Sequence, residues 1–159
     1  MRSSSKHPML AAALTFALAG IASAALAQDK EGVVKNRETL MKGQGKDLGN
    51  VKAYIDGKGD LAQAEAGAAN LTQSTKKIPD MFPPGTGGTD ADGKYGTKPD
   101  IWSDWNKFLD VQKAATAKAD ALLVAVKSGD KAAIQTAFGD LGKNGCGACH
   151  ETFREKLKD

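Results

Sequence analysis

The sequence predicts an all-α fold, an antiparallel up-down-up-down four-helix bundle. Four stretches of the chain place apolar residues at spacings of three, four and seven, the period of helices with one buried face. No stretch alternates apolar and polar residues as a half-buried strand does. The links between the four stretches are short except one, and short links make successive helices antiparallel neighbours.

The first two helices are predicted over residues 33–51 and 61–78. In the first, three apolar positions follow one another at intervals of seven: Val34, Met41 and Leu48. The second follows Asp60, a suitable N-cap because its carboxylate can accept hydrogen bonds from free backbone N–H groups. Residues 79–99 are rich in Pro, Gly, Asp and Thr without an apolar period, which predicts a long loop.

The third helix has the clearest period and is predicted to run from Asp100, as N-cap, to Val126. Ser128-Gly129-Asp130 then ends this helix and begins a fourth. The fourth helix is expected to reach Leu157 through a segment loosened by glycines, residues 142–147.

The N-terminus has the pattern of a secretory signal peptide. Arg2 and Lys6 precede an apolar stretch that ends in Ala-Leu-Ala, the small-x-small sequence that signal peptidases cut. We interpret residues 1–27 as a cleaved signal peptide. The alternative is an uncleaved anchor, because the nineteen mostly apolar residues 9–27 can just span a bilayer of about 30 Å.

The remaining residues 28–159 suffice for one domain with one core. Without Arg2 and Lys6 they carry 20 basic and 19 acidic residues, a formal net charge of +1. Because a nucleic-acid surface needs a basic excess on one face, no nucleic-acid partner is expected. Nor is stable membrane insertion expected after the signal peptide is removed.

Both cysteines and the only histidine of this domain lie within five residues, Cys146-Gly147-Ala148-Cys149-His150. Residues at i, i+3 and i+4 share one helix face, so two thiols and an imidazole can contact the same planar ligand. The spacing is typical of c-type haem attachment, with two thioethers to the haem and the imidazole on its iron. The sequence thus predicts one covalent haem c, held by Cys146 and Cys149, with His150 as the proximal iron ligand.

Three other roles of such a motif fit less well. A thioredoxin-like dithiol needs a strand before its helix, and a structural zinc site needs four ligands where three are present. A disulfide across three helical positions has poor geometry and leaves His150 without a role. Export agrees with haem attachment, because bacteria attach haem covalently outside the cytoplasm.

Several segments together carry a resemblance to a known family. They are Asn36-Arg37 with Met41, the loop residues 82–88, the run 99–104, residues 137–142, and the motif 146–150 with Phe153 and Arg154. They resemble the class II c-type cytochromes, the cytochrome c′ family, over essentially all of residues 28–159. The resemblance implies a periplasmic four-helix bundle with haem attached near its C-terminal helix.

The residue on the far face of the iron, opposite the histidine, differs between branches of the family. Many cytochromes c′ leave iron five-coordinate behind an apolar residue, whereas the low-spin branch places a methionine four residues after the first-helix arginine. Met41 follows Arg37 at this spacing, so the resemblance implies six-coordinate iron between His150 and Met41. From the residues alone, Met41 is either a soft ligand that raises the reduction potential or a packing residue on its stripe. Met81, in the loop, is the second candidate.

Two arginines are candidates for supporting roles. Arg37 has a planar fork that suits a haem propionate, and its alternative is an exposed ion pair of little energetic value. Arg154, one turn after His150, resembles the family's arginine beside the proximal ligand. Its alternative is a solvated cation favoured by the helix dipole.

The expected function is one-electron transfer between Fe(III) and Fe(II), without enzymatic chemistry by side chains, during transient docking with redox protein partners. The alternative is the binding or sequestering of small gases such as nitric oxide, which requires that Met41 be off the iron or displaceable. A homodimer is an option through the small residues Ala62, Ala66 and Ala69, which otherwise form a surface of high helix propensity.

Overall fold

The computed structural model describes residues 16–157, with side chains described from residue 30 onward. Residues 1–15 of the predicted signal peptide lie outside this description. The helices are α1 (Phe16–Ile55), α2 (Leu61–Lys76), α3 (Asp100–Ser103), α4 (Trp105–Ser128), α5 (Lys131–Asp140) and α6 (Ala148–Phe153). The other elements are the 3₁₀ turn η1 (Pro79–Met81), the π-helical segment η2 (Leu141–Gly147), and the short strands β1 (Tyr95–Thr97) and β2 (Arg154–Lys156).

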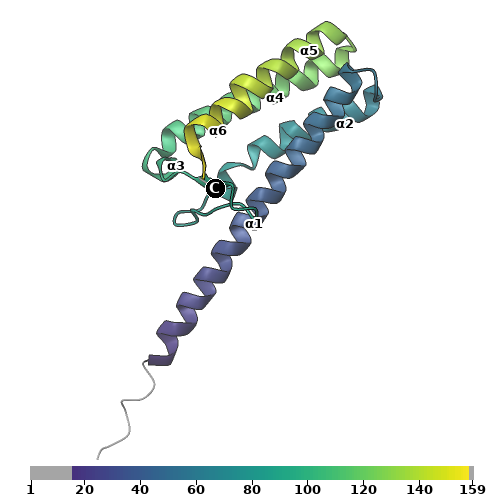
Figure 1. The fold of residues 1–159 in the computed structure, drawn as a ribbon. Helices are drawn as coiled ribbons and strands as arrows, with labels where there is room; N and C mark the ends of the chain where they lie inside the picture. Colours follow the sequence, from purple (N-terminus) through teal and green to yellow (C-terminus); the bar gives the residue numbers. More distant parts are fainter. Residues whose placement is uncertain (1–15, 158–159) are drawn as a thin grey trace, which may run out of the picture.

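Four helical rods form the bundle, which confirms the predicted fold. The rods are α1, α2, α4 and the run of α5, η2 and α6, and the chain links them in an antiparallel order (Figure 1). α2 packs against α1 and α4, while α4 also packs against α5, η2 and α6. In the part of the chain that the structure describes, no helix combines the length and apolarity that crossing a membrane requires.

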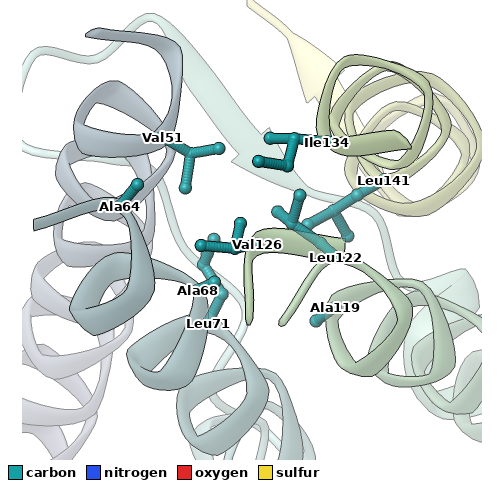
Figure 2. Packing of buried hydrophobic residues seen from close by; sticks show 9 residues of the cluster. All are labelled: Val51, Ala64, Ala68, Leu71, Ala119, Leu122, Val126, Ile134 and Leu141. Carbon is teal, nitrogen blue, oxygen red and sulfur yellow. The ribbon is translucent and has the colours of Figure 1, made fainter. Parts of the chain in front are cut away.

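The core between the rods is built from aliphatic and small side chains (Figure 2). Its members are Val51, Ala64, Ala68, Leu71, Ala119, Leu122, Val126, Ile134 and Leu141. Every one of them is at most 1% exposed. Full burial of an aliphatic side chain contributes about 1.5–3 kcal/mol, so this cluster stabilises the end of the bundle where α1 meets α2 and α4 meets α5.

Aspartates begin two of the helices at the predicted places. The Asp60 carboxylate accepts a hydrogen bond from Gln63 N at 2.7 Å at the start of α2. Asp130 accepts from Ala132 N at 2.9 Å at the start of α5. Gly129 ends α4 in the left-handed region, with φ of 71°, where a residue with a Cβ atom would be strained.

The prediction that Asp100 is the N-cap of the third helix is wrong. Asp100 lies inside the one-turn helix α3, which Pro99 precedes. The backbone then leaves helical geometry at Asp104, with φ of −128° and ψ of 60°, and the Asp104 carboxylate accepts from Lys107 N. Aspartate side chains compete for backbone N–H groups, and here that competition divides the predicted helix in two.

The fourth helix ends at Phe153, before the predicted end at Leu157. Arg154 is extended, and β2 pairs antiparallel with β1, with Thr97 opposite Arg154. Strands of three residues are too short to show an alternating pattern, so sequence periodicity gave no sign of them. The pair ties the loop between α2 and α3 to the helix that carries the Cys-x-x-Cys-His motif.

Candidate functional site

A cavity of about 370 Å³ opens where α1, the loop between α2 and α3, and α6 come together. The residues on its wall that matter below are Arg37, Met41, Phe82, Tyr95, Phe108, Cys149, His150, Phe153 and Arg154. Both α1 and α6 contribute side chains to the wall, so residues more than 100 positions apart in the sequence share one cavity.

His150 lies on α6, half-buried at this cavity. Burial, and secondly the positive charge of Arg154, lower the pKa of the imidazole from 6.5 to about 4. The side chain is therefore neutral at pH 7, which is the form of histidine that binds a metal ion.

The two cysteines are free thiols, and they occupy different surroundings. Cys149 lines the cavity and packs against its aromatic wall. Cys146 packs against the aliphatic core of Figure 2 and is not on the cavity wall. Burial raises the pKa of Cys146, and burial together with the neighbouring Cys146 raises the pKa of Cys149 to about 11. Catalytic dithiols have a lowered pKa instead, so these thiols do not resemble a thioredoxin-like pair.

The segment that carries Cys146 is π-helical, a rare geometry that is frequent at functional sites. A Cβ atom on Gly145 would lie 3.0 Å from Leu141 Cδ1 and 3.5 Å from the Cα of Ala115, so the missing side chain lets η2 approach α4 closely. At the start of η2, the Asp140 carboxylate accepts from Lys118 Nζ at 2.6 Å and from Asn144 Nδ2 at 2.7 Å. These contacts fix the segment just before the motif.

An aromatic cluster walls the cavity. Phe108 is 1% exposed and lies at its centre, with ring centroids 5.1 Å from Phe82, 5.0 Å from Trp105 and 5.3 Å from Phe153. Phe108 and Trp105 thus pack the core at this end of the bundle, and Phe108 also lines the cavity. A planar, apolar ligand would meet ring edges and faces on this wall.

The structure separates the two candidate methionines. Met41, on α1, lines the cavity that Cys149 and His150 also line. Met81, at the end of η1, packs against the same aromatic cluster and is not on the cavity wall. Met41 is therefore the methionine that shares a cavity with the histidine.

Arg37 is buried, with 7% exposure, so the exposed ion pair that was one of its predicted alternatives does not describe it. Its Nε and Nη2 donate to Met81 O at 3.0 and 2.8 Å, and Nη2 also reaches Thr86. Nη1 donates to Thr97 Oγ1 at 3.2 Å. The guanidinium also lies 4.0 Å from the centroid of the Phe82 ring. Its donors are directed mainly at the loop, not at an exposed acid, and a propionate contact stays a prediction.

Arg154 also differs in setting from the prediction. It lies on β2, not one turn further along the helix from His150, and its guanidinium carbon is 4.1 Å from the centroid of the Tyr95 ring. Both residues line the cavity. Arg154 thus reaches the site from a strand, held by a stacking contact with the loop.

Tyr95 and Thr97 also line the cavity and were not predicted as residues of the site. The available signal was Asp92-Gly93, a dipeptide typical of hairpin turns. Gly93 has φ of 69°, and Thr89 forms a bridge with Gly96 across that turn. A hairpin in the predicted loop therefore brings these side chains to the cavity.

The residues present fit a covalently bound haem. The cavity is mostly apolar, a neutral imidazole and a thiol lie on its wall, a second thiol is three residues away, and a methionine lies on the wall from another helix. Iron–porphyrin chemistry supplies one-electron exchange or gas binding, and the axial side chains and the burial of the site tune it.

A four-helix bundle with a Cys-x-x-Cys-His motif on its last helix defines the class of c-type cytochromes with haem near the C-terminus. Residues 32–154 match the family model described as Cytochrome C′. The chain therefore belongs to the cytochrome c′ family, with covalent haem c and its iron as cofactor. Proteins of this family carry electrons or bind gases and are not enzymes.

Relatives with similar sequences carry several names. Cytochrome c′ of Allochromatium vinosum is 29% identical over 95% of this chain and 99% of its own. Cytochrome c-556 of Rhodopseudomonas palustris is 35% identical over 88% of this chain and 93% of its own. Cytochrome c-554 of Cereibacter sphaeroides is 35% identical over 94% of this chain and 99% of its own.

Solved structures agree on the fold. A cytochrome c′ structure matches with a TM-score of 0.69 at 31% identity, covering 79% of this chain and 97% of that one. The nitric oxide complex of a variant cytochrome c′ from Alcaligenes xylosoxidans matches with a TM-score of 0.70 at 31% identity, covering 80% and 97%.

Proposed function

We propose that this protein is a periplasmic electron-transfer cytochrome whose iron is ligated by His150 and Met41. Cys146 and Cys149 form the thioethers to the haem. The observation that carries this proposal is that Met41, from α1, and His150, from α6, line one apolar cavity. Met41 also follows the first-helix arginine at the spacing that marks the low-spin branch of the family.

Two protein ligands suit electron transfer. A thioether opposite an imidazole raises the reduction potential and leaves the iron no open position for a substrate. The surrounding side chains then need only exclude water and hold the ligands in place. The protein would meet its redox partners through small, short-lived interfaces.

Gas binding is the second candidate function, and the comparisons favour it. Relatives named cytochrome c′ match over most of the chain, and matching solved structures include nitric oxide complexes of the Alcaligenes xylosoxidans protein. In this alternative Met41 packs at the cavity without holding the iron, or leaves it when a gas binds.

Carbon monoxide titration of the reduced wild-type protein separates the two functions. Electron transfer with Met41 on the iron predicts little spectral change at gas concentrations that saturate an open haem. Ready, saturable binding would support the gas-binding function. Cys146→Ser and Cys149→Ser variants, stained for covalent haem after denaturing electrophoresis, test the attachment sites in the same preparation.

Export is a further part of this proposal. Residues 1–27 act as a signal peptide cut before Gln28, which delivers the haem domain, residues 28–159, to the periplasm where covalent attachment takes place. The mass of the purified protein would show the processed N-terminus directly. An intact N-terminus in the membrane fraction would favour the uncleaved anchor instead.

Self-association is proposed through the exposed part of α2. Ala62 and Ala66 are exposed and Ala69 is half-buried, so a second helix could approach this face closely. A related cytochrome c′ structure, at 27% identity and a TM-score of 0.72, is described as having ligand-controlled dimer dissociation. Sedimentation of the wild type beside an Ala66→Glu variant would show whether this face associates.

A further inference from the structure

Arg37 joins α1 to three separate points of the loop between α2 and α3. It donates to the carbonyl of Met81, to both oxygens of Thr86 and to the hydroxyl of Thr97, partners 44 to 60 positions away in the sequence. The Phe82 ring lies 4.0 Å from its guanidinium. One side chain therefore fixes the start, the middle and the end of the loop segment 81–97.

Arg37 uses nearly all the hydrogen-bond donors of its guanidinium group. Nε, both hydrogens of Nη2 and one of Nη1 are directed at acceptors of the loop, out of five donors in total. Among the described residues, no carboxylate lies within 4.0 Å of this side chain. Since a buried charge needs compensation, the carbonyl and hydroxyl oxygens of the loop provide it, and the loop cannot move without exposing them.

Met81 is anchored through its backbone. Its carbonyl accepts two of the hydrogen bonds, from Nε at 3.0 Å and Nη2 at 2.8 Å, and its side chain packs outside the cavity wall. Phe82, the next residue, is 7% exposed and lines the cavity in its place. The cavity wall that includes His150 thus carries the Phe82 ring and not the Met81 side chain.

We propose that Arg37 is a positioning residue that selects the distal iron ligand, by anchoring the backbone of Met81 so that its thioether stays outside the haem cavity. The inference rests on the proposed haem site, although not on the ligation of Met41. Without the anchor, the loop can turn Met81 inward, because a thioether side chain has three rotatable bonds and adapts to irregular spaces. Lysine cannot replace the arginine, since an ammonium group has no planar fork to bridge carbonyl and hydroxyl acceptors.

The test uses Met41→Ala as its background, so that any thioether ligation must come from Met81. The variants are Met41→Ala, Met41→Ala with Arg37→Gln, and Met41→Ala with Arg37→Gln and Met81→Leu. Absorption and magnetic circular dichroism spectra report spin state and thioether ligation of the iron. Amide hydrogen exchange over residues 81–97 reports the loop.

The expected result is loss of thioether ligation in Met41→Ala, its return in the double variant with faster exchange in the loop, and its loss again in the triple variant. Arg37→Lys keeps the positive charge and is also expected to restore thioether ligation in the Met41→Ala background. It replaces Arg37→Gln in the test if the Arg37→Gln variant does not fold. Thioether ligation through Met81 in Met41→Ala alone would overturn the inference. So would a double variant whose loop exchanges faster while its iron shows no thioether.

The proposed function fails in a different way. If Met41 does not ligate the iron, the wild type itself lacks the thioether signal, and the double variant is still expected to gain it from Met81. The comparison of wild type with Met41→Ala therefore tests the function, and the comparison of the double with the triple variant tests the anchor.

Discussion

The ring of Phe108 meets the ring of Phe153 edge-on, with centroids 5.3 Å apart and planes at 82°. The pair joins α4 to α6, the helix that carries Cys149 and His150. Because Phe108 also packs against Phe82 and Trp105, it connects three of the elements around the cavity. The position of the motif helix therefore depends on this ring.

Phe108→Ala is predicted to lower the free energy of unfolding by about 3–5 kcal/mol, because it removes a fully buried aromatic side chain and leaves a cavity. Urea denaturation followed by circular dichroism measures the change. Val124→Ala is a suitable control, since Val124 is 71% exposed, and its effect should stay within about 0.5 kcal/mol. Equal effects of the two substitutions would contradict the packing described here.

Thr72→Val is predicted to stabilise the protein by about 1 kcal/mol. The Thr72 hydroxyl is buried without a hydrogen-bond partner within the described residues, and an unsatisfied buried hydroxyl costs about 1–3 kcal/mol. Thr75→Val on the same helix is the matched control. The Thr75 hydroxyl donates to Leu71 O at 2.9 Å, so its removal should not stabilise the protein. The melting temperature should thus rise for Thr72→Val, and it should fall or stay unchanged for Thr75→Val.

The stability of the haem-free protein, in which His150 is not bound to iron, is predicted to fall as the pH is lowered from about 6.5 toward 4. Burial lowers the pKa of His150 to about 4 in the folded protein, whereas an unfolded histidine has a pKa near 6.5. Below pH 6.5 the unfolded chain thus binds a proton that the folded chain does not, and stability is lost with decreasing pH. The full difference corresponds to about 3 kcal/mol.

Urea unfolding of the haem-free protein at pH 7, 5.5 and 4.5 follows this loss, and His150→Gln provides the reference without a titrating imidazole. The wild type should lose stability relative to the variant as the pH falls. Parallel curves for the two proteins would show that another group causes the pH dependence.

Tyr95→Leu is predicted to destabilise the pairing of β1 with β2. The Tyr95 ring lies 4.1 Å from the guanidinium carbon of Arg154, and such an exposed contact contributes about 0.5–1 kcal/mol. Tyr95→Phe keeps the ring and should retain this contribution. Amide exchange at Leu157, whose N–H donates to Lys94 O at 2.8 Å, measures the opening of the strand pair in each variant.

The sequence predicted the rods of the bundle because their apolar periods are long and regular. It predicted the loosened segment 142–147 from its glycines, and the structure has π-helical geometry there. It did not predict the break in the third helix, where Asp104 accepts from a backbone N–H and divides the helix. A single aspartate scarcely alters an apolar period averaged over two turns.

The part of the site whose haem-binding residues lie close together in the sequence was predictable, namely Cys146, Cys149 and His150. Met41 as iron ligand is what the resemblance to the low-spin branch implies, and the structure has Met41 on the wall of the cavity that His150 also lines. The contacts of Arg37 were not predictable, because they join residues 44 to 60 positions apart through a loop without periodicity. The approach of Arg154 from a strand depended on a pairing that only the folded chain reveals.

Ligation of the iron by Met41 is tested most directly by the absorption spectrum of purified wild-type protein beside that of Met41→Ala, in both oxidation states. We predict a low-spin, six-coordinate spectrum for the wild type and a high-spin spectrum for Met41→Ala, with covalent haem in both. A wild-type spectrum that is already high-spin, or a spectrum that Met41→Ala leaves unchanged, would contradict ligation of the iron by Met41.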